Sequence, residues 1–122
     1  MNIWLKNRGI EQRFEREYAR GRETAQAGPH SFVVVLERLR PIRNAAAIVR
    51  TVDALGGQGV YLVGMRFLDP VPTSGSLRNV PLRFFDEPED AISALVADGY
   101  SLFALEPAHE FAEPKYLHEI AL

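Results

Sequence analysis

Residues 31–65 form the stretch that decides the fold, SFVVVLERLRPIRNAAAIVRTVDALGGQGVYLVGM. An unbroken apolar run lies within Ser31 to Leu39 and is typical of a strand buried on both faces of a parallel sheet. Asn44 to Leu55 is rich in small and apolar residues and predicts a helix, with Asn44 as its N-cap and Gly56-Gly57 as its stop. Gly59 to Met65 predicts a second strand. The stretch therefore predicts a β-α-β unit.

The same alternation continues towards the carboxyl end of the chain. Val80 to Phe85 predicts a third strand, Glu87 to Asp98 a helix, and Tyr100 to Leu105 a fourth strand, whereas several breakers make Met65 to Asn79 a loop. Strands that alternate with helices of this length favour right-handed crossovers in a parallel sheet. The expected fold class is therefore α/β, with a mostly parallel Rossmann-like sheet and helices on both of its faces.

A basic helical segment precedes this region. No proline occurs between Ile10 and Gln26, and Ile10, Phe14 and Tyr18 recur every four residues, as on one stripe of a helix. A second stripe holds three arginines, Arg13, Arg16 and Arg20. The 122 residues suffice for one ordinary domain with one core. We divide them into a basic helical segment, residues 1–30, and a partial α/β domain, residues 31–122.

Charge is unevenly distributed along the chain, although the formal net charge is only −2. Residues 1–50 hold ten Lys and Arg against five Glu, whereas residues 51–122 hold four basic side chains against eleven acidic ones. A basic end indicates an anionic partner, and arginine suits bidentate phosphate contacts. The alternative is a solvated, salt-bridged helix, because glutamates stand among the arginines at helical spacing. Charge alone favours neither interpretation.

Composition excludes several classes of protein. Without cysteine the chain has no disulfide, thiolate metal site or cysteine nucleophile. Its apolar runs are far below the roughly 20 residues that a membrane helix requires, so we expect a cytoplasmic protein without a membrane segment. His30, His109 and His118 lack the spacings of metal ligands, and no metal is expected.

The loop after the first predicted strand carries the clearest functional signal, because ligands bind beyond the carboxyl ends of parallel strands. This loop and the helix behind it hold Arg38, Arg40, Arg43, Asn44 and Arg50. The apolar neighbours of Arg50 predict that its guanidinium is buried and needs a partner. The alternative to a functional role is a simple ion pair with Asp53, with Asn44 serving only as the helix cap.

The segment from Ile42 to Gly56 resembles the first signature of the SpoU, or TrmH-like, branch of the SPOUT methyltransferases. That signature has an Asn, an Arg-Thr six residues later, an Asp-Ala and a small C-terminal turn. Six residues match it, namely Asn44, Arg50, Thr51, Asp53, Ala54 and Gly56. The resemblance extends over residues 31 to 107, where Gly99 to Pro107 is similar to a core strand of the family. It departs from the family at Ala45-Ala46, where many members have a Gly or Ser.

The resemblance implies that a homodimer methylates a ribose 2′-hydroxyl in tRNA or rRNA with S-adenosylmethionine. It implies a catalytic Arg50 that acts on the reacting hydroxyl and the neighbouring phosphate, with Asn44 holding the shape of the site. By the same resemblance, Leu105 and Glu106 border the methyl donor. The RNA is expected to contact the basic side chains Arg13, Arg16, Arg20, Arg22, Arg40 and Arg43.

A second departure concerns the cofactor. Family members continue into a signature around Gly-Asn-Glu and another around Ser-Leu-Asn, which form the trefoil knot that wraps the donor. Neither occurs in these 122 residues. We therefore expect a truncated chain whose knot region is absent or incomplete, which binds the donor poorly and is inactive alone, so whether it is itself an enzyme stays open. The alternative is a non-enzymatic RNA-binding or dimerisation module built on the same half-fold.

Overall fold

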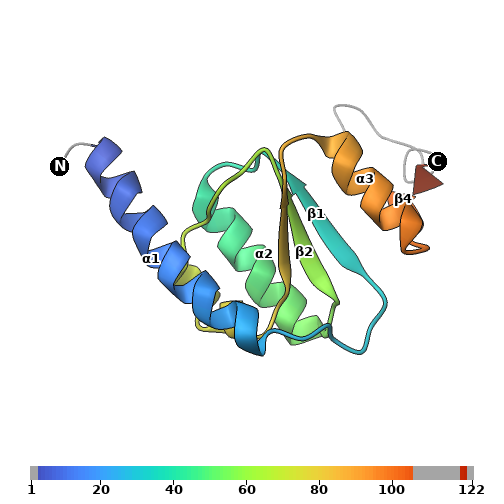
Figure 1. Ribbon diagram of the computed structural model, residues 1–122, viewed down its shortest axis with the longest axis horizontal. Coiled ribbons are helices and arrows are strands. Elements are labelled where there is room, and N and C mark those ends of the chain that lie inside the picture. Colours follow the sequence, from blue (N-terminus) through green and yellow to red (C-terminus); the bar gives the residue numbers. More distant parts are fainter. Residues whose placement is uncertain (1–2, 106–118, 121–122) are drawn as a thin grey trace. The chain divides into compact units, whose positions relative to one another are not determined.

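The computed structural model describes residues 3–105 and 119–120, and the chain divides into two compact units, residues 1–91 and 92–122 (Figure 1). In chain order the elements are α1 (Ile3–Thr24), β1 (Val33–Glu37), α2 (Ile42–Leu55), β2 (Gly59–Val63), the 3-10 turns η1 (Val71–Thr73) and η2 (Ser76–Arg78), β3 (Leu82–Phe85), α3 (Pro88–Ala97), β4 (Leu102–Phe103) and β5 (Glu119–Ile120). Helix α3 begins in the first unit and ends in the second.

Strands β1, β2 and β3 form one parallel sheet with β2 in the middle. Val34 of β1 lies opposite Val60 of β2, which in turn lies opposite Leu82 of β3. Every residue of β2 is buried, as its apolar run predicts for a strand that is covered on both faces. The predicted β-α-β unit is confirmed, and so is the α/β fold class with a parallel sheet flanked by helices.

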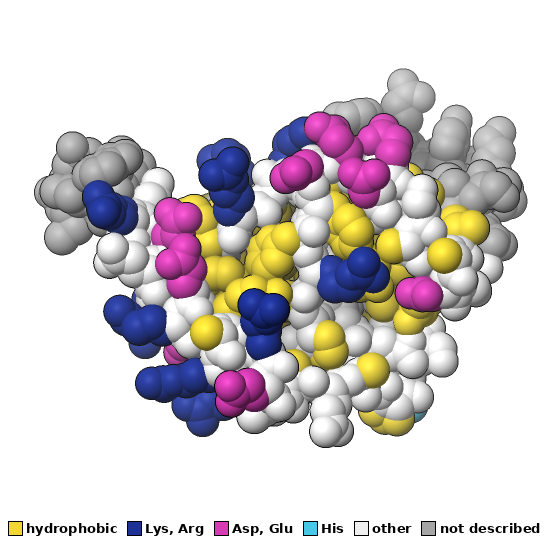
Figure 2. Space-filling model, viewed as in Figure 1, with side chains coloured by type: hydrophobic (Ala, Val, Ile, Leu, Met, Phe, Trp, Pro, Cys, Tyr) yellow, Lys and Arg dark blue, Asp and Glu magenta, His cyan; other side chains and the backbone are white. Residues whose placement is uncertain are grey.

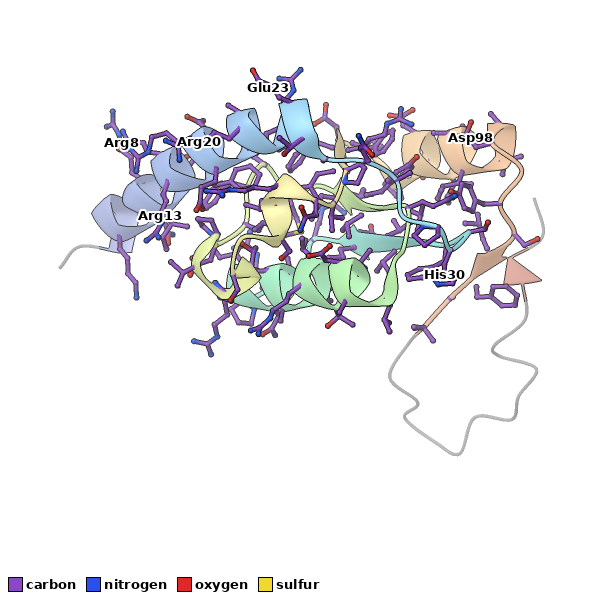
Figure 3. The ribbon with its side chains drawn as sticks, turned by 90° about the horizontal axis from the view of Figure 1, so that it is seen from below. Arg8, Arg13, Arg20, Glu23, His30 and Asp98 are labelled. Carbon is purple, nitrogen blue, oxygen red and sulfur yellow. The ribbon has the colours of Figure 1, made fainter. Side chains whose placement is uncertain are left out.

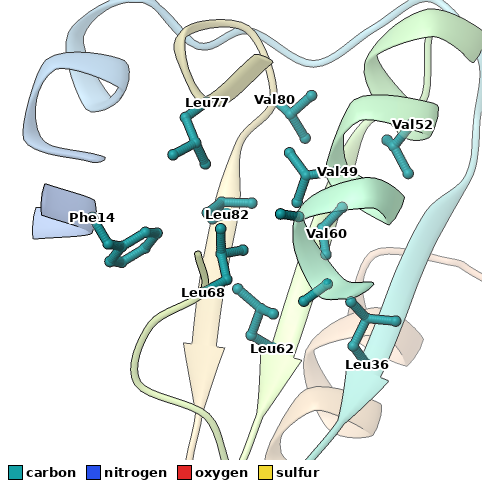
Figure 4. Close-up of a cluster of buried hydrophobic side chains, with 12 residues drawn as sticks. Phe14, Leu36, Val49, Val52, Val60, Leu62, Leu68, Leu77, Val80 and Leu82 are labelled. Carbon is teal, nitrogen blue, oxygen red and sulfur yellow. The ribbon is translucent and has the colours of Figure 1, made fainter. Parts of the chain in front are cut away.

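Helix α2 packs against the sheet through a face of small side chains. Four residues are buried on this face, namely Ala45, Ala46, Val49 and Val52. They belong to one apolar cluster with Leu62 of β2 (Figure 4). The helix ends where the glycines predict. Gly56 adopts a left-handed conformation with φ of 72°, and its N–H donates to the Asp53 carbonyl oxygen at 3.2 Å.

Helix α1 joins the same core through aromatic rings. Phe14 leaves only 2% of its surface exposed and stacks on Tyr18, with the ring centroids 5.4 Å apart. Both rings meet Phe84 of β3 edge to face. The Tyr18 hydroxyl also donates to the Leu82 carbonyl oxygen at 3.5 Å. The helix therefore packs alongside the edge strand β3, and it begins ahead of the predicted start at Ile10.

The predicted fourth strand differs from the structure. In the second unit, β4 covers only Leu102–Phe103 and pairs with β5 in the antiparallel sense. A strand does lie within Tyr100 to Leu105 as predicted, but it is shorter and belongs to a separate antiparallel sheet. The apolar residues there favour an extended chain, but a side-chain pattern does not specify the strand with which that chain pairs.

Because α1 lies close to the loop before β3, two glycines of this helix should respond differently to substitution by alanine. A Cβ atom at Gly21 would collide with the backbone carbonyl of Leu77, whereas a Cβ atom at Gly9 would meet nothing within 4 Å. We expect Gly21→Ala to lower the free energy of unfolding by about 1–3 kcal/mol, as overpacking does. Gly9→Ala should raise it by up to about 1 kcal/mol through helix propensity. Urea denaturation measures both, and equal effects of the two substitutions would contradict this packing of α1.

Candidate functional site

The carboxyl ends of β1 and β2 open into a hollow of about 440 Å³. Three arginines from two loops line it, Arg38 and Arg40 after β1 and Arg66 after β2, together with Asn7 of α1. Other parts of its wall come from Gly64 and from the start of α2 at Ile42. Figure 2 shows Lys and Arg side chains near the upper end of the sheet, beside a group of Asp and Glu side chains, as well as along α1. We call this feature the arginine hollow.

The arginines of the hollow alternate with apolar residues that pack in the core. Leu39 lies between the two arginines after β1, and Met65 and Phe67 flank Arg66. All three apolar side chains are partly buried against the core cluster, whereas the arginines are exposed. The alternation therefore anchors both loops and leaves the guanidinium groups in contact with solvent.

Arg38 has a defined position. It adopts a left-handed conformation with φ of 46°, and its N–H donates to the Val63 carbonyl oxygen at 2.9 Å. Its side chain lies across Gly64, where a Cβ atom would come within 2.7 Å of Cγ and 2.8 Å of Nε. Nη1 of Arg38 also lies 3.3 Å from Oε1 of Glu37 in an exposed ion pair, and such pairs contribute little to stability. The glycine at position 64 thus makes room for the Arg38 side chain.

Asn44 does not cap α2, contrary to the sequence prediction. The helix begins at Ile42, with Pro41 at its N-cap position and without a side-chain cap hydrogen bond. Asn44 lies in the first turn, where its backbone N–H donates to the Pro41 carbonyl oxygen at 3.0 Å and its side chain is exposed. The prediction is wrong because Pro41, whose φ is compatible with a helix start, begins the helix earlier than Asn44 would.

Arg50 is exposed, which corrects the prediction that its guanidinium is buried. The helical repeat places it with Ala47 and Ala54 on the outer face of α2, and these alanines make an exposed face look apolar in the sequence. Asp53, the expected ion-pair partner, instead accepts a hydrogen bond from Asn79 Nδ2 at 3.1 Å. Within residues 3–105 and 119–120, no hydrogen bond or ion pair holds the guanidinium of Arg50.

Other residues of the matched signature have structural roles. Thr51 Oγ1 donates to the Ala47 carbonyl oxygen at 3.0 Å within the helix, and Gly56 ends the helix. Asn44 and Arg50 keep polar side chains that face solvent. They are not brought into contact, because six residues of a helix separate them by about 9 Å along its axis and by roughly 120° around it. A ligand that meets both must extend along α2.

The arginine stripe of α1 is exposed, and Figure 3 shows Arg13 and Arg20 on this helix. In the described part of the chain no ion pair joins Arg13, Arg16 or Arg20 to a glutamate. This finding argues against the alternative of a salt-bridged helix. Arg22 is placed differently, because its guanidinium carbon lies 5.8 Å from the centroid of the Tyr18 ring in a cation–π contact. Arg43, in the first turn of α2, is exposed.

The described residues do not enclose a methyl donor at the place that the resemblance implies. Leu105 leaves 89% of its surface exposed, and Glu106 lies outside the described residues. Among residues 3–105 and 119–120, no three His, Cys, Asp or Glu side chains form a group that could hold a metal ion. None of the described helices is long and apolar enough to span a membrane.

The comparison with protein families decides the assignment. The sequence model of the SpoU rRNA Methylase family matches residues 31–122, which include the whole signature and both loops of the arginine hollow. The chain belongs to the SpoU methylase family. Comparisons with curated proteins and with solved structures found no match. Membership of the SpoU family assigns the chain to the RNA methyltransferases of the SPOUT type.

Arg66 is the residue of this SpoU chain that sequence reasoning misses. Its signal is its position directly after the second strand, at the carboxyl edge where ligands bind in parallel sheets. The resemblance directs attention to the loop after β1 instead. Only the parallel pairing of β1 with β2 brings Arg66 to the same hollow as Arg38.

Two polar residues near the end of α2 are expected to respond differently to substitution. Asp53→Ala removes the hydrogen bond from Asn79 and should lower the free energy of unfolding by about 1 kcal/mol. Arg50→Ala removes an exposed side chain and should change it by less than about 0.5 kcal/mol. Urea denaturation of both variants and of Asn79→Ala measures the difference.

A double-mutant cycle provides the control. The effects of Asp53→Ala and Asn79→Ala should be coupled, because the two side chains form one hydrogen bond, whereas those of Asp53→Ala and Arg50→Ala should add. Coupling between Asp53 and Arg50 would mean that the ion pair forms in solution and would overturn the placement of Arg50.

Proposed function

We propose that this chain contributes the RNA-facing part of a methyltransferase that transfers a methyl group from S-adenosylmethionine to a ribose 2′-hydroxyl in tRNA or rRNA. The observation that carries the proposal is the exposed guanidinium of Arg50, free of protein partners among the described residues and set in the matched family signature. A guanidinium needed only for folding would be expected to have a protein partner.

The proposed role of Arg50 follows from the chemistry of the acceptor. A ribose 2′-hydroxyl is a poor nucleophile, so it must be oriented in line with the methyl group, and its developing negative charge must be stabilised. The planar fork of N–H donors on a guanidinium can serve both needs and can also hold the neighbouring phosphate. Arg50 does not accept the proton in this proposal, because arginine stays charged. Asn44 offers an amide donor and acceptor to position the RNA.

S-adenosylmethionine would supply the methyl group, and we propose that its site requires segments with the two further family signatures. Neither signature occurs in residues 1–122, and Leu105, at the proposed border of the donor site, is almost fully exposed. Residues 1–122 by themselves are therefore proposed to bind the donor poorly and to be inactive. Leu105 and Glu106 would contact the donor only when those segments are present.

A homodimer in the cytoplasm is proposed for the working enzyme. The second unit offers apolar surface to a partner chain, since Phe103 and Leu105 expose 65% and 89% of their surface. The same surface favours the second candidate function, a non-enzymatic RNA-binding or dimerisation module that uses the half-fold. The two candidates differ in whether Arg50 matters for methyl transfer.

The proposed binding of RNA to α1 can be tested by removing positive charge from this helix. Replacing Arg13, Arg16 and Arg20 together by Gln should weaken binding of a single-stranded RNA oligonucleotide. Each lost phosphate contact should lower the slope of log affinity against log salt by about 0.7, so the triple variant should lose about 2. Fluorescence anisotropy at several salt concentrations measures affinity and slope.

Arg78→Gln is the matched control for this prediction, because Arg78 is an exposed arginine of η2, outside the stripe. It should leave the salt slope nearly unchanged. If Arg78→Gln lowers RNA affinity and salt slope as much per removed charge as the triple variant does, only the net charge matters and α1 is not an RNA-binding element.

Methyl transfer tests the catalytic assignment. A chain in which the two donor signatures follow these residues should methylate RNA, and Arg50→Lys should slow the transfer by about 100-fold. The reason is that lysine keeps the charge but lacks the planar fork. Transfer of the labelled methyl group measures the rate, and resistance of the product to alkaline cleavage shows that the 2′-oxygen carries the methyl group.

The folding control is urea denaturation, in which Arg50→Lys should match the parent chain. Unchanged methyl transfer in this variant would contradict the catalytic role of Arg50.

Calorimetric titration of residues 1–122 with S-adenosylmethionine should show no micromolar binding. Micromolar binding would overturn the proposal that further segments are needed for the donor.

A further inference from the structure

We infer that the arginine hollow is a phosphate site, which holds a phosphodiester of the RNA near the nucleotide that is modified. The inference rests on the proposed function, because it takes the ligand to be RNA. It assigns a role to Arg38 and Arg66, which lie outside the matched signature, in addition to Arg40.

The wall of the hollow has the chemistry of an anion site. Three arginines line one hollow of about 440 Å³, and none of the described residues that line it is an Asp or Glu. A guanidinium presents paired N–H donors that match two phosphate oxygens, so arginine is the side chain best suited to such contacts. Glu37 competes only for Arg38, in an exposed pair at 3.3 Å that a phosphate can replace.

The two loops that carry the arginines are held in place by the core. Leu39, Met65 and Phe67 anchor the two loops in the core, so the backbone on either side of each arginine is fixed. Gly64 leaves space for the side chain of Arg38. The N–H of Gly64 donates to the Phe85 carbonyl oxygen at 2.8 Å, which ties this turn to β3. A site that is positioned before binding loses less conformational entropy when the ligand arrives.

The hollow lies at the amino-terminal end of α2. Ile42, the first residue of α2, lines the hollow, and helix amino termini attract anions through their free N–H groups and dipole. Arg50 lies about 12 Å further along the same helix. A phosphate in the hollow would therefore belong to a nucleotide near the one whose hydroxyl meets Arg50.

Helix α1 carries further arginines beyond the hollow. Asn7 of this helix also lines the hollow, and Arg13 follows about 9 Å further along the helix axis. The helical repeat places Arg13, Arg16 and Arg20 about 120° to 180° around α1 from Asn7, so a negatively charged strand that meets both the hollow and this stripe must wrap around the helix. A free phosphate ion would use the hollow alone, whereas RNA would use both.

The test uses the 122-residue chain and single charge-removing substitutions. Arg38→Gln and Arg66→Gln should each weaken binding of a single-stranded RNA oligonucleotide about tenfold, as expected for loss of a charge-assisted contact. Each should also lower the salt slope by about 0.7. Arg78→Gln is again the control and should change affinity less than about twofold. Arg66→Lys should recover only part of the loss, because lysine lacks the fork.

Three outcomes would overturn the inference, and they differ in what else they affect. If the parent chain binds RNA but Arg38→Gln and Arg66→Gln behave like Arg78→Gln, the hollow is not the phosphate site while the proposed function stands. If the parent chain binds no RNA at low salt, the proposed RNA function fails, and this inference fails with it. If inorganic phosphate shifts the NMR signals of the Gly64 and Arg66 amides but does not compete with RNA, the hollow binds the free ion and not RNA.

Discussion

The packing of the small-residue face of α2 against β2 is the contact on which the rest of the structure depends. Ala46 and Val49 of α2 and Leu62 of β2 are fully buried in the same cluster. Because this face consists of alanines and valines, the helix has one orientation about its axis in which it fits closely against the sheet. That orientation turns Asn44 and Arg50 outwards, so the chemistry of the chain is a consequence of how its core packs.

This packing also separates two roles within one sequence signature. Asp53 and Gly56 hold the end of α2 against the rest of the unit, through the hydrogen bond from Asn79 and the left-handed turn. Asn44 and Arg50 make no comparable contacts among the described residues. A signature residue therefore need not act in catalysis, and the hydrogen bonds of the folded chain show which ones serve the fold.

Aromatic packing places the basic helix in the same unit as the loops. Phe14 and Tyr18 meet Phe84 of β3, and this contact sets the position of α1 along the edge of the sheet. As a result Asn7 reaches the hollow at the carboxyl ends of β1 and β2. The uneven charge along the sequence thus places exposed arginines both on α1 and in the loops of the hollow, and such separated contacts suit a long anionic ligand better than a small one.

The sequence alone determined the β-α-β unit, the end of α2 at Gly56 and the family, because apolar runs, glycine punctuation and residue spacing are local signals. Only the tertiary structure decided that Arg50 is exposed, that α2 begins directly after Pro41 and not at Asn44, and that β4 pairs outside the parallel sheet. It also placed Arg66 in the same hollow as Arg38. The physical reason is the same in each case: exposure, strand partners and the meeting of distant loops depend on which surfaces pack together, and a local pattern of side chains does not contain that information.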